Sequence, residues 1–275
     1  METLDLFNNN DNIEKVETLE NEPDRIIEEA YQERLVQEEK EKTPSDNISI
    51  LESYGEDLTA KEYITNPAIG RDKEINDMIL ALITPDKGAL LTGKPGIGKT
   101  AIVEGLAYRI INGDVPDALK NWRIMKVSIT SMLGSNTNSS GNTDSRLELL
   151  LQELKEQKNV ILFIDEVHLL VNKSGATNVD FANMLKPYLD RGTIKMIGAT
   201  TTEEYEAYIL RDRAFLRRFI KIDIVESDVE TVVKILMGTY PRYEKKLNVK
   251  MAYTDFQKEN IFRFLTEISI SHFNI

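Results

Sequence analysis

The most constraining feature of this sequence is Gly93–Thr100, which reads Gly-Lys-Pro-Gly-Ile-Gly-Lys-Thr and fits the pattern G-x-x-x-x-G-K-S/T at every position. The apolar run Gly88–Thr92 precedes it, and Lys99–Ile111 follows with apolar residues at helical spacing. Glycines at these places let successive backbone N–H groups curl around phosphate oxygens, and the helix N-terminus adds partial positive charge. A chance glycine-rich turn is the alternative, which the strand and helix on either side disfavour. We therefore predict a phosphate-binding loop made of Gly93, Lys94, Pro95, Gly96, Ile97, Gly98, Lys99 and Thr100.

A second motif lies 66 residues after Lys99, where the apolar segment Asn159–Ile164 ends at Asp165 and Glu166. Lys99 is predicted to reach the β- and γ-phosphates of a nucleotide, while Thr100 and Asp165 are predicted to hold Mg²⁺. Glu166 is predicted to orient and deprotonate an attacking water molecule. Because acidic residues commonly end strands at the solvent edge, this pair is informative only together with the phosphate loop.

The base of the nucleotide is predicted to be adenine. A GTPase with this loop is the rival, and it is expected to read guanine with an Asn-Lys-x-Asp motif. The one candidate in the sequence, Asn172–Gly175, reads Asn-Lys-Ser-Gly and lacks the aspartate. ATP and Mg²⁺ are therefore the expected cofactors.

The order of apolar segments predicts an α/β fold. Five runs have the character of strands: Gly88–Thr92, Arg123–Ile129, Asn159–Asp165, Ile194–Thr201 and Phe219–Val225. Helical segments separate them, notably at 147–158 and 180–189, and such alternation is typical of a mostly parallel, doubly wound sheet. We therefore predict a mostly parallel five-stranded sheet flanked by helices within residues 48–225. Residues 226–275 are predicted to form a partial helical subdomain with two helices, at 229–246 and 254–273.

The charge of the chain is concentrated at its N-terminus. The formal net charge is −12, and residues 1–47 contain 15 acidic and 5 basic residues, so the remaining residues are nearly neutral. An acidic chain is not expected to bind nucleic acid or an anionic membrane. Within this tail, Pro23–Lys42 has a narrow apolar stripe at helical spacing. The tail is interpreted either as a short docking or coiled-coil arm or as a solvated, largely disordered leader.

Other residue counts exclude further classes of site. The chain has no cysteine, which excludes disulfide frameworks, thiolate zinc sites and cysteine nucleophiles. Its histidines are His168 and His272, too few for a histidine zinc site, and His168 is expected to be a partly buried core residue. The N-terminus lacks the pattern of a secretory signal, and no apolar run approaches the ~18 residues of a membrane span. A cytoplasmic protein is expected.

Several further blocks accompany the phosphate loop in a fixed order. They are Asn66–Glu74 (NPAIGRDKE), Ala101–Ala107 (AIVEGLA), Ile110–Pro116 (IINGDVP), Ile161–His168 (ILFIDEVH), Asn183–Pro187 (NMLKP), Gly198–Tyr205 (GATTEEY) and Arg217–Phe219 (RRF). From about Tyr54 onward, over about four-fifths of the chain, the sequence therefore resembles the first ATPase module of the Clp-type AAA+ unfoldases and disaggregases. The resemblance implies an AAA+ P-loop NTPase fold.

The resemblance also implies roles for individual residues. Ile69 and Gly70 line the adenine pocket, and Thr201 is a polar group near the γ-phosphate and the attacking water. Arg217 and Arg218 are arginine fingers that reach the nucleotide of a neighbouring subunit. Without the resemblance, these two arginines are interpreted as a solvated basic pair beside a strand.

The chain departs from the family pattern in three respects. Family members carry an aromatic residue beside glycine in a pore-facing loop, whereas the corresponding Ser131–Arg146 has no aromatic residue, and Ser, Asn, Thr or Gly fill 12 of its 16 positions. This composition predicts a mobile loop that grips substrate poorly. The sequence also lacks a second ATPase module and a globular N-terminal domain, and its helical subdomain is short. A truncated ATPase and a fragment of a longer one both remain open.

Two functions follow from these expectations. The first is an ATP-hydrolysing module that acts in a homo-oligomeric, hexameric ring, or with another Clp-type subunit, and remodels a protein substrate. The second is a non-catalytic, nucleotide-dependent assembly or regulatory protein whose tail docks a partner.

Overall fold

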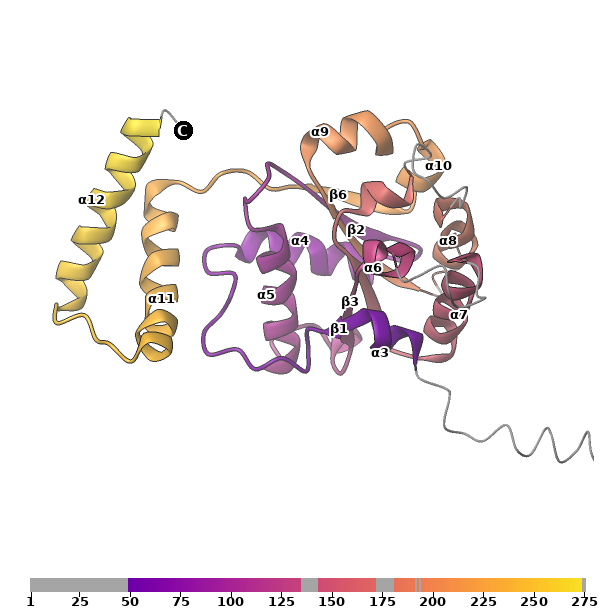
Figure 1. Cartoon of the computed structure of the whole chain (residues 1–275), viewed down its shortest axis with the longest axis horizontal. Helices are drawn as coiled ribbons and strands as arrows, with labels where there is room; N and C mark the ends of the chain where they lie inside the picture. Colours follow the sequence, from indigo (N-terminus) through magenta and orange to yellow (C-terminus); the bar gives the residue numbers. More distant parts are fainter. Residues whose placement is uncertain (1–48, 135–142, 172–180, 191, 193, 274–275) are drawn as a thin grey trace, which may run out of the picture. The chain divides into compact units, whose positions relative to one another are not determined.

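Five parallel strands form the centre of the structure, a computed structural model (Figure 1). They are β2 (Gly88–Thr92), β3 (Arg123–Val127), β4 (Val160–Ile164), β5 (Lys195–Thr200) and β6 (Phe219–Asp223), and they lie in the order β3-β4-β5-β2-β6. Every residue of β2 and β4 is buried, as expected for strands covered on both faces. The predicted α/β fold with a mostly parallel sheet is confirmed.

The structure describes residues 49–134, 143–171, 181–190, 192 and 194–273. These residues belong to one compact unit. The acidic tail 1–47 lies outside them, and so does its predicted helix at Pro23–Lys42.

The sheet has one strand more than the five predicted. β1 (Gly55–Asp57) pairs antiparallel with the edge strand β3, with Gly55 opposite Val127 and Asp57 opposite Met125. Its three residues are too few to produce a recognisable alternation of apolar and polar side chains. Pairing with β3 and the hydrogen bond from Arg123 to Asp57 hold this short strand in place.

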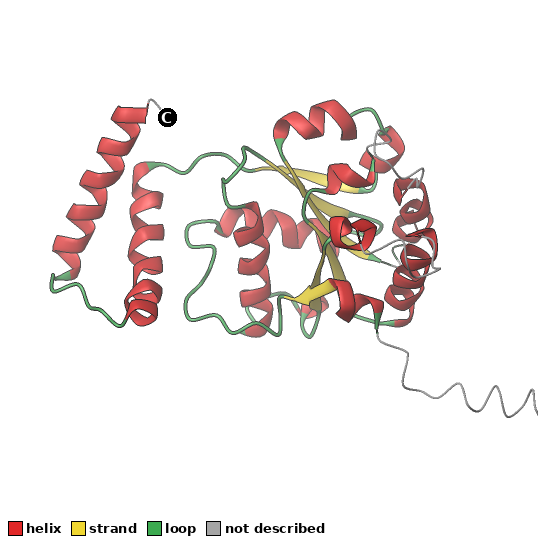
Figure 2. Cartoon of the chain, in the orientation of Figure 1, coloured by secondary structure: helices red, strands yellow, loops and turns green. Residues whose placement is uncertain are grey.

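Helices cover both faces of the sheet (Figure 2). One face packs against α4 (Asp72–Ile83) and α5 (Lys99–Ile111). The other packs against α3 (Ile50–Tyr54), α6 (Ile129–Gly134), α7 (Thr143–Glu156), α8 (Phe181–Asp190) and α10 (Arg213–Leu216). Alternation along a strand divides the core in the same way: Leu90 faces the second set, while Ala89 and Leu91 face the first.

Shorter elements and a helical pair complete the described chain. The short elements are the 3₁₀ helices η1 (Asp117–Leu119) and η2 (Val167–Leu170), α9 (Thr202–Glu204) and the π-helix η3 (Tyr205–Ile209). At the C-terminal end, α11 (Val229–Leu247) packs against α12 (Asp255–Phe273), so the two helices expected there are present (Figure 1). Asp228 caps α11 by accepting a hydrogen bond from the backbone N–H of Thr231 at 2.8 Å.

The prediction that Ser131–Arg146 forms a mobile loop is wrong at both ends of the segment. Its first residues belong to α6 and its last residues to α7, while 135–142 lie outside the described residues. Met132, which belongs to α6, is fully buried in the core. Tertiary burial of this one side chain overrides the polar composition around it.

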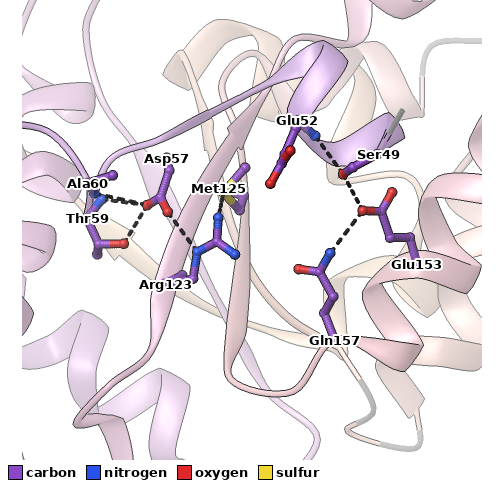
Figure 3. A network of polar contacts seen from close by, with 9 residues as sticks. All are labelled: Ser49, Glu52, Asp57, Thr59, Ala60, Arg123, Met125, Glu153 and Gln157. Atoms are coloured by element: carbon purple, nitrogen blue, oxygen red, sulfur yellow. Dashed lines mark hydrogen bonds and ion pairs between the residues drawn. The ribbon is translucent and has the colours of Figure 1, made fainter. Parts of the chain in front are cut away.

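A network of polar contacts fastens the N-terminal end of the described chain to the sheet (Figure 3). Arg123 on β3 donates from Nε to Asp57 Oδ2 at 2.7 Å, and the backbone N–H groups of Thr59 and Ala60 donate to Asp57 Oδ1 at 2.8 and 3.2 Å. Beside it, Glu153 on α7 accepts from the backbone N–H of Leu51 at 3.1 Å. These carboxylates tie α3 and β1 to elements far away in the sequence.

The surroundings of Asp57 favour its charged form. Burial alone raises the pKa of this carboxyl group, but hydrogen bonds from Thr59 and Arg123 and the charge of Arg123 outweigh it and hold the pKa below its ordinary value. A lowered pKa in the folded state stabilises the fold above the unfolded-state pKa of Asp57. That stabilisation is lost as the pH falls through the folded-state pKa.

We therefore expect Asp57→Asn to lower the free energy of unfolding by about 1 kcal/mol at pH 7, because an amide accepts weaker hydrogen bonds than a carboxylate. The difference from the parent should shrink below about pH 4. Urea denaturation across this pH range measures both effects. Glu56→Gln, which removes an exposed charge from the same strand, is the matched control. If the difference in the free energy of unfolding stays constant with pH, ionisation of Asp57 does not stabilise the fold.

Candidate functional site

The predicted phosphate loop joins β2 to α5 and is open on its inner side. Gly96 and Gly98 have φ values of +74° and +98°, and no described atom lies within 4 Å of the position that a Cβ would take. Glycine adopts this left-handed backbone without steric cost. At Gly93, by contrast, a Cβ would lie 2.7 Å from the carbonyl oxygen of Ile224, so glycine allows the loop to start against the end of β6.

Lys99, the first residue of α5, is held within this loop. Its Nζ donates to the carbonyl oxygens of Gly93 at 2.9 Å and Lys94 at 3.0 Å. The ammonium group therefore lies at the phosphate loop, where phosphate oxygens can replace the two carbonyl groups as acceptors. Of the other loop residues, Lys94 and Pro95 are exposed and Ile97 is half-buried.

The next residue, Thr100, is hydrogen-bonded to the end of β4. Its Oγ1 donates to Asp165 Oδ2 at 2.9 Å. Mg²⁺ at nucleotide sites takes one or two protein oxygens and completes its shell with phosphate and water oxygens. A hydroxyl and a carboxylate in contact, beside the phosphate loop, are a donor set that fits this ion.

Lys126 is a neighbour of Asp165 that the sequence analysis missed. It lies on β3, with its Nζ 3.5 Å from Asp165 Oδ2 and 5.8 Å from the centre of the Phe163 ring. The register of the sheet pairs Lys126 with Phe163. No sequence signal marks this contact, because it depends on β3 and β4 being neighbours.

Glu166 and Thr201 follow neighbouring strands at the same edge of the sheet. Glu166 is exposed and directly precedes η2, and its φ of 58° is unusual for a residue other than glycine. Thr201 directly follows β5 and caps α9. Because β5 lies between β4 and β2, Thr201 is placed between Glu166 and the phosphate loop.

A largely apolar cavity of about 630 Å³ extends from the phosphate loop to the C-terminal helices. Arg71 and Ile97 line it on one side, and the other side comes from α11 and α12. The helical lining residues are Val232, Ile235, Leu236, Phe262, Leu265, Thr266, Ser269 and Ile270. Arg71 is buried and donates from Nη1 to the carbonyl of Val225 and to Glu74, both at 2.9 Å, so its guanidinium is fixed at the rim.

Ile69 and Gly70, predicted to line a base pocket, lie next to this cavity and pack against α11. A Cβ added to Gly70, whose φ is +74°, would lie 2.6 Å from Thr231 Cγ2. Gly238 approaches Ile69 so closely that a Cβ there would be 1.9 Å from Ile69 Cδ1. Arg71, rather than these two residues, is the part of this turn that lines the cavity.

Arg217 and Arg218 lie at the opposite end of the sheet from the phosphate loop. They precede β6, whose first residue Phe219 is paired with Gly88, the first residue of β2. The loop follows the other end of β2, about 16 Å away at the usual rise of a strand. Arg217 is exposed, whereas Arg218 is half-buried and its Nη1 donates to the carbonyl of Ala214 at 2.5 Å. The structure thus does not bring the arginines to this chain's own phosphate loop.

The described residues contain neither a candidate membrane span nor a candidate metal cluster. No helix among them is long and apolar enough to cross a membrane. In the same part of the chain, no three histidine, aspartate or glutamate side chains gather into a group that could hold a metal ion.

The site has the geometry of a P-loop nucleotide-binding protein. A glycine-rich loop joins a strand to a helix that begins with a lysine, and the next residue, a threonine, donates a hydrogen bond to an aspartate. Residues 89–223 match the profile of the ATPase family associated with various cellular activities (AAA). Chaperone protein ClpB 2 of Thermosynechococcus vestitus is 42% identical over 224 residues, which are 79% of this chain and 25% of that protein. The ClpC subunit of an ATP-dependent Clp protease from Staphylococcus saprophyticus is 44% identical over 204 residues, or 73% of this chain and 25% of ClpC.

Solved structures agree with these sequence relatives. The Saccharomyces cerevisiae Hsp104–ADP complex has a TM-score of 0.68 and 37% identity over 80% of this chain and 37% of the Hsp104 chain. An Hsp104–casein complex in an extended conformation has a TM-score of 0.65 and 40% identity over 74% of this chain and 35% of the other. The chain belongs to the Clp-type AAA+ ATPases. It spans about a quarter of the length of the curated relatives it matches.

We expect Lys99→Ala to weaken nucleotide binding by about 10- to 100-fold, because it removes a charge-assisted hydrogen bond to phosphate. Isothermal titration calorimetry with a non-hydrolysable ATP analogue measures the affinity. Lys73→Ala, at an exposed position on α4, is the control and should leave the affinity unchanged. Wild-type affinity in Lys99→Ala would remove this lysine from the site.

Proposed function

We propose that this chain binds ATP with Mg²⁺ at the phosphate loop, hydrolyses it within a ring of subunits, and uses the energy to remodel a protein substrate. One observation carries the proposal: Lys99, Thr100 and Asp165 meet at one loop, with Thr100 donating to Asp165 at 2.9 Å. These are the groups that P-loop ATPases use to hold the terminal phosphates and the metal ion.

Each residue has a role in the proposed reaction. Lys99 donates to the β- and γ-phosphate oxygens, and the glycine loop presents its backbone N–H groups to them. Thr100 and Asp165 would hold Mg²⁺, which supplies neutralisation of the phosphate charge that develops during transfer. Glu166 accepts a proton from the attacking water, and Thr201 orients this water beside the γ-phosphate.

The apolar cavity is proposed to take the adenine ring. It is continuous with the phosphate loop through Ile97, and its aliphatic and aromatic lining suits the faces of a purine. Under this proposal residues 48–225 form the nucleotide-binding subdomain and 226–275 the helical subdomain. The base is bound where the two meet.

The position of Arg217 supports hydrolysis in an oligomer. Because this exposed side chain lies about 16 Å along the sheet from its own loop, it cannot stabilise the transition state there. In a closed ring with head-to-tail contacts it can reach the next subunit's nucleotide. Arg218, which folds back onto Ala214, is assigned the lesser role of holding this turn.

A protein substrate is proposed from the relatives, since one matched Hsp104 structure contains casein. The absence of an aromatic residue from Ser131–Arg146 favours a weak grip on such a substrate. The second candidate function, nucleotide-dependent assembly without threading, rests on this same observation.

We expect Glu166→Gln to lower kcat by about 10²- to 10⁴-fold and to leave ATP affinity unchanged, since the amide still hydrogen-bonds water but cannot accept its proton. Phosphate release and calorimetry give the two values. Glu206→Gln, an exposed position on η3, is the control. Hydrolysis at the parent rate in Glu166→Gln would show that another group is the base.

The rate of hydrolysis per subunit should rise with protein concentration, in parallel with assembly measured by sedimentation velocity. Arg217→Ala should lower the assembled rate by about 10³-fold or more, because the charge that it supplies acts across the subunit boundary. Arg213→Ala, exposed on α10, is the matched control. Tight ATP binding with no turnover at any concentration supports the assembly function instead.

A further inference from the structure

A polar cluster, buried at two of its three residues, lies between the turn that carries Glu166 and the strand end that carries Thr201. Its members are His168 on η2, Thr200 at the end of β5 and Glu204 on α9. His168 and Thr200 are 8% and 2% exposed. The proposed reaction assigns no role to these three residues.

One oxygen atom connects the cluster. Glu204 Oε2 accepts from Thr200 Oγ1 at 3.1 Å and from the backbone N–H of Thr201 at 3.0 Å, and it lies 3.1 Å from His168 Nδ1. His168 Nδ1 is also 3.2 Å from Thr200 Oγ1. The ring of Tyr208 stacks on the imidazole, with centroids 6.0 Å apart and planes 25° apart.

The protonation of the cluster follows from counting donors. Burial raises the pKa of Glu204, but hydrogen bonds from Thr201 and Thr200 and the charge of His168 outweigh it, so the pKa lies below its ordinary value. An ionised carboxylate only accepts hydrogen bonds, so Nδ1 of His168 carries a proton. Thr200 uses its single hydrogen on Glu204 and therefore accepts from His168.

Capping of α9 does not by itself explain these contacts. The cap needs only the exchange between Thr201 and Glu204, in which the backbone N–H of Glu204 donates to Thr201 Oγ1 at 3.2 Å. Glu204 additionally joins a strand end and η2. These two elements already lie unusually close, since a Cβ at Gly198 on β5 would be 3.0 Å from Val167 Cγ1.

We propose that His168 and Glu204 are positioning residues for hydrolysis, which fix the turn of Glu166 against Thr201 so that both groups face one water molecule. His168 lies two residues after Glu166, whose left-handed backbone leaves its direction dependent on how η2 is held. The Glu204 carboxylate fixes Thr201 through its backbone N–H. The inference rests on the proposed function, because it assumes that Glu166 is the base.

Substitutions at His168 separate the hydrogen bond from packing. Asn can place its amide nitrogen near the position of Nδ1, so His168→Asn should keep kcat close to that of the parent. His168→Leu fills the site but donates no hydrogen bond, and kcat should fall by about 10- to 100-fold with unchanged ATP affinity. A merely structural role would instead change stability and affinity together.

Glu204→Gln is the second test, and its combination with His168→Leu measures the coupling between the two residues. Alone it should lower kcat by about tenfold at unchanged affinity, and combined with His168→Leu it should add nothing, because the two residues act as one unit. Glu203→Gln, exposed on the same short helix, is the control. Rates are measured at concentrations where the ring is assembled. His168→Met, which also donates no hydrogen bond, replaces the leucine variant if the latter fails to bind nucleotide.

Each result then decides between two claims. Loss of kcat in the donor-deficient variants, with rescue by His168→Asn, supports the inference. Parent-like kcat in Glu204→Gln and in the donor-deficient His168 variant, while Glu166→Gln is inactive, overturns it and leaves the proposed function intact. Full activity of Glu166→Gln overturns the proposed function itself.

Discussion

Parallel pairing of β4, β5 and β2 is the constraint on which the nucleotide site depends. It brings the carboxyl ends of three strands to one edge of the sheet, where the phosphate loop, Asp165 and Thr201 follow directly. The hydrogen bond from Thr100 to Asp165 is possible only because this edge is shared. Parallel pairing of β6 with β2 places Arg217 at the far edge, so under the proposed function the arginine of each site comes from a neighbouring subunit.

The parts of the fold that the sequence predicts are those in which local pattern and tertiary environment agree. Gly88–Thr92 and Lys99–Ile111 match β2 and α5 in full, because an all-apolar run, a glycine loop and helical spacing occur in succession. β1 escaped prediction, since its three residues depend on Asp57 and Arg123 for their place. The helical residues at the two ends of Ser131–Arg146 were not predicted either, and at the first end Met132 is fully buried despite the polar composition around it.

The candidate site divides in the same way. Lys99, Thr100 and Asp165 were predictable, since each belongs to a motif of consecutive residues beside a buried strand. Lys126 and the cluster of His168, Thr200 and Glu204 were not, because each contact joins elements whose adjacency appears only once the strand order is known. The apolar cavity likewise combines the phosphate loop with helices more than 130 residues later. Motifs thus indicate where phosphate would bind, and the tertiary structure shows which residues surround that place.

The central claim is that each active site takes its base from one subunit and its arginine from the next. Mixing Glu166→Gln with Arg217→Ala tests it most directly, with ATP hydrolysis measured for each variant alone and for an equal mixture at assembling concentration. The account predicts two nearly inactive variants and a mixture that recovers about a quarter of the parent rate, because a random ring pairs an intact Glu166 with an intact Arg217 at that frequency. A mixture no more active than the sum of its parts, or a fully active Arg217→Ala, would contradict the account.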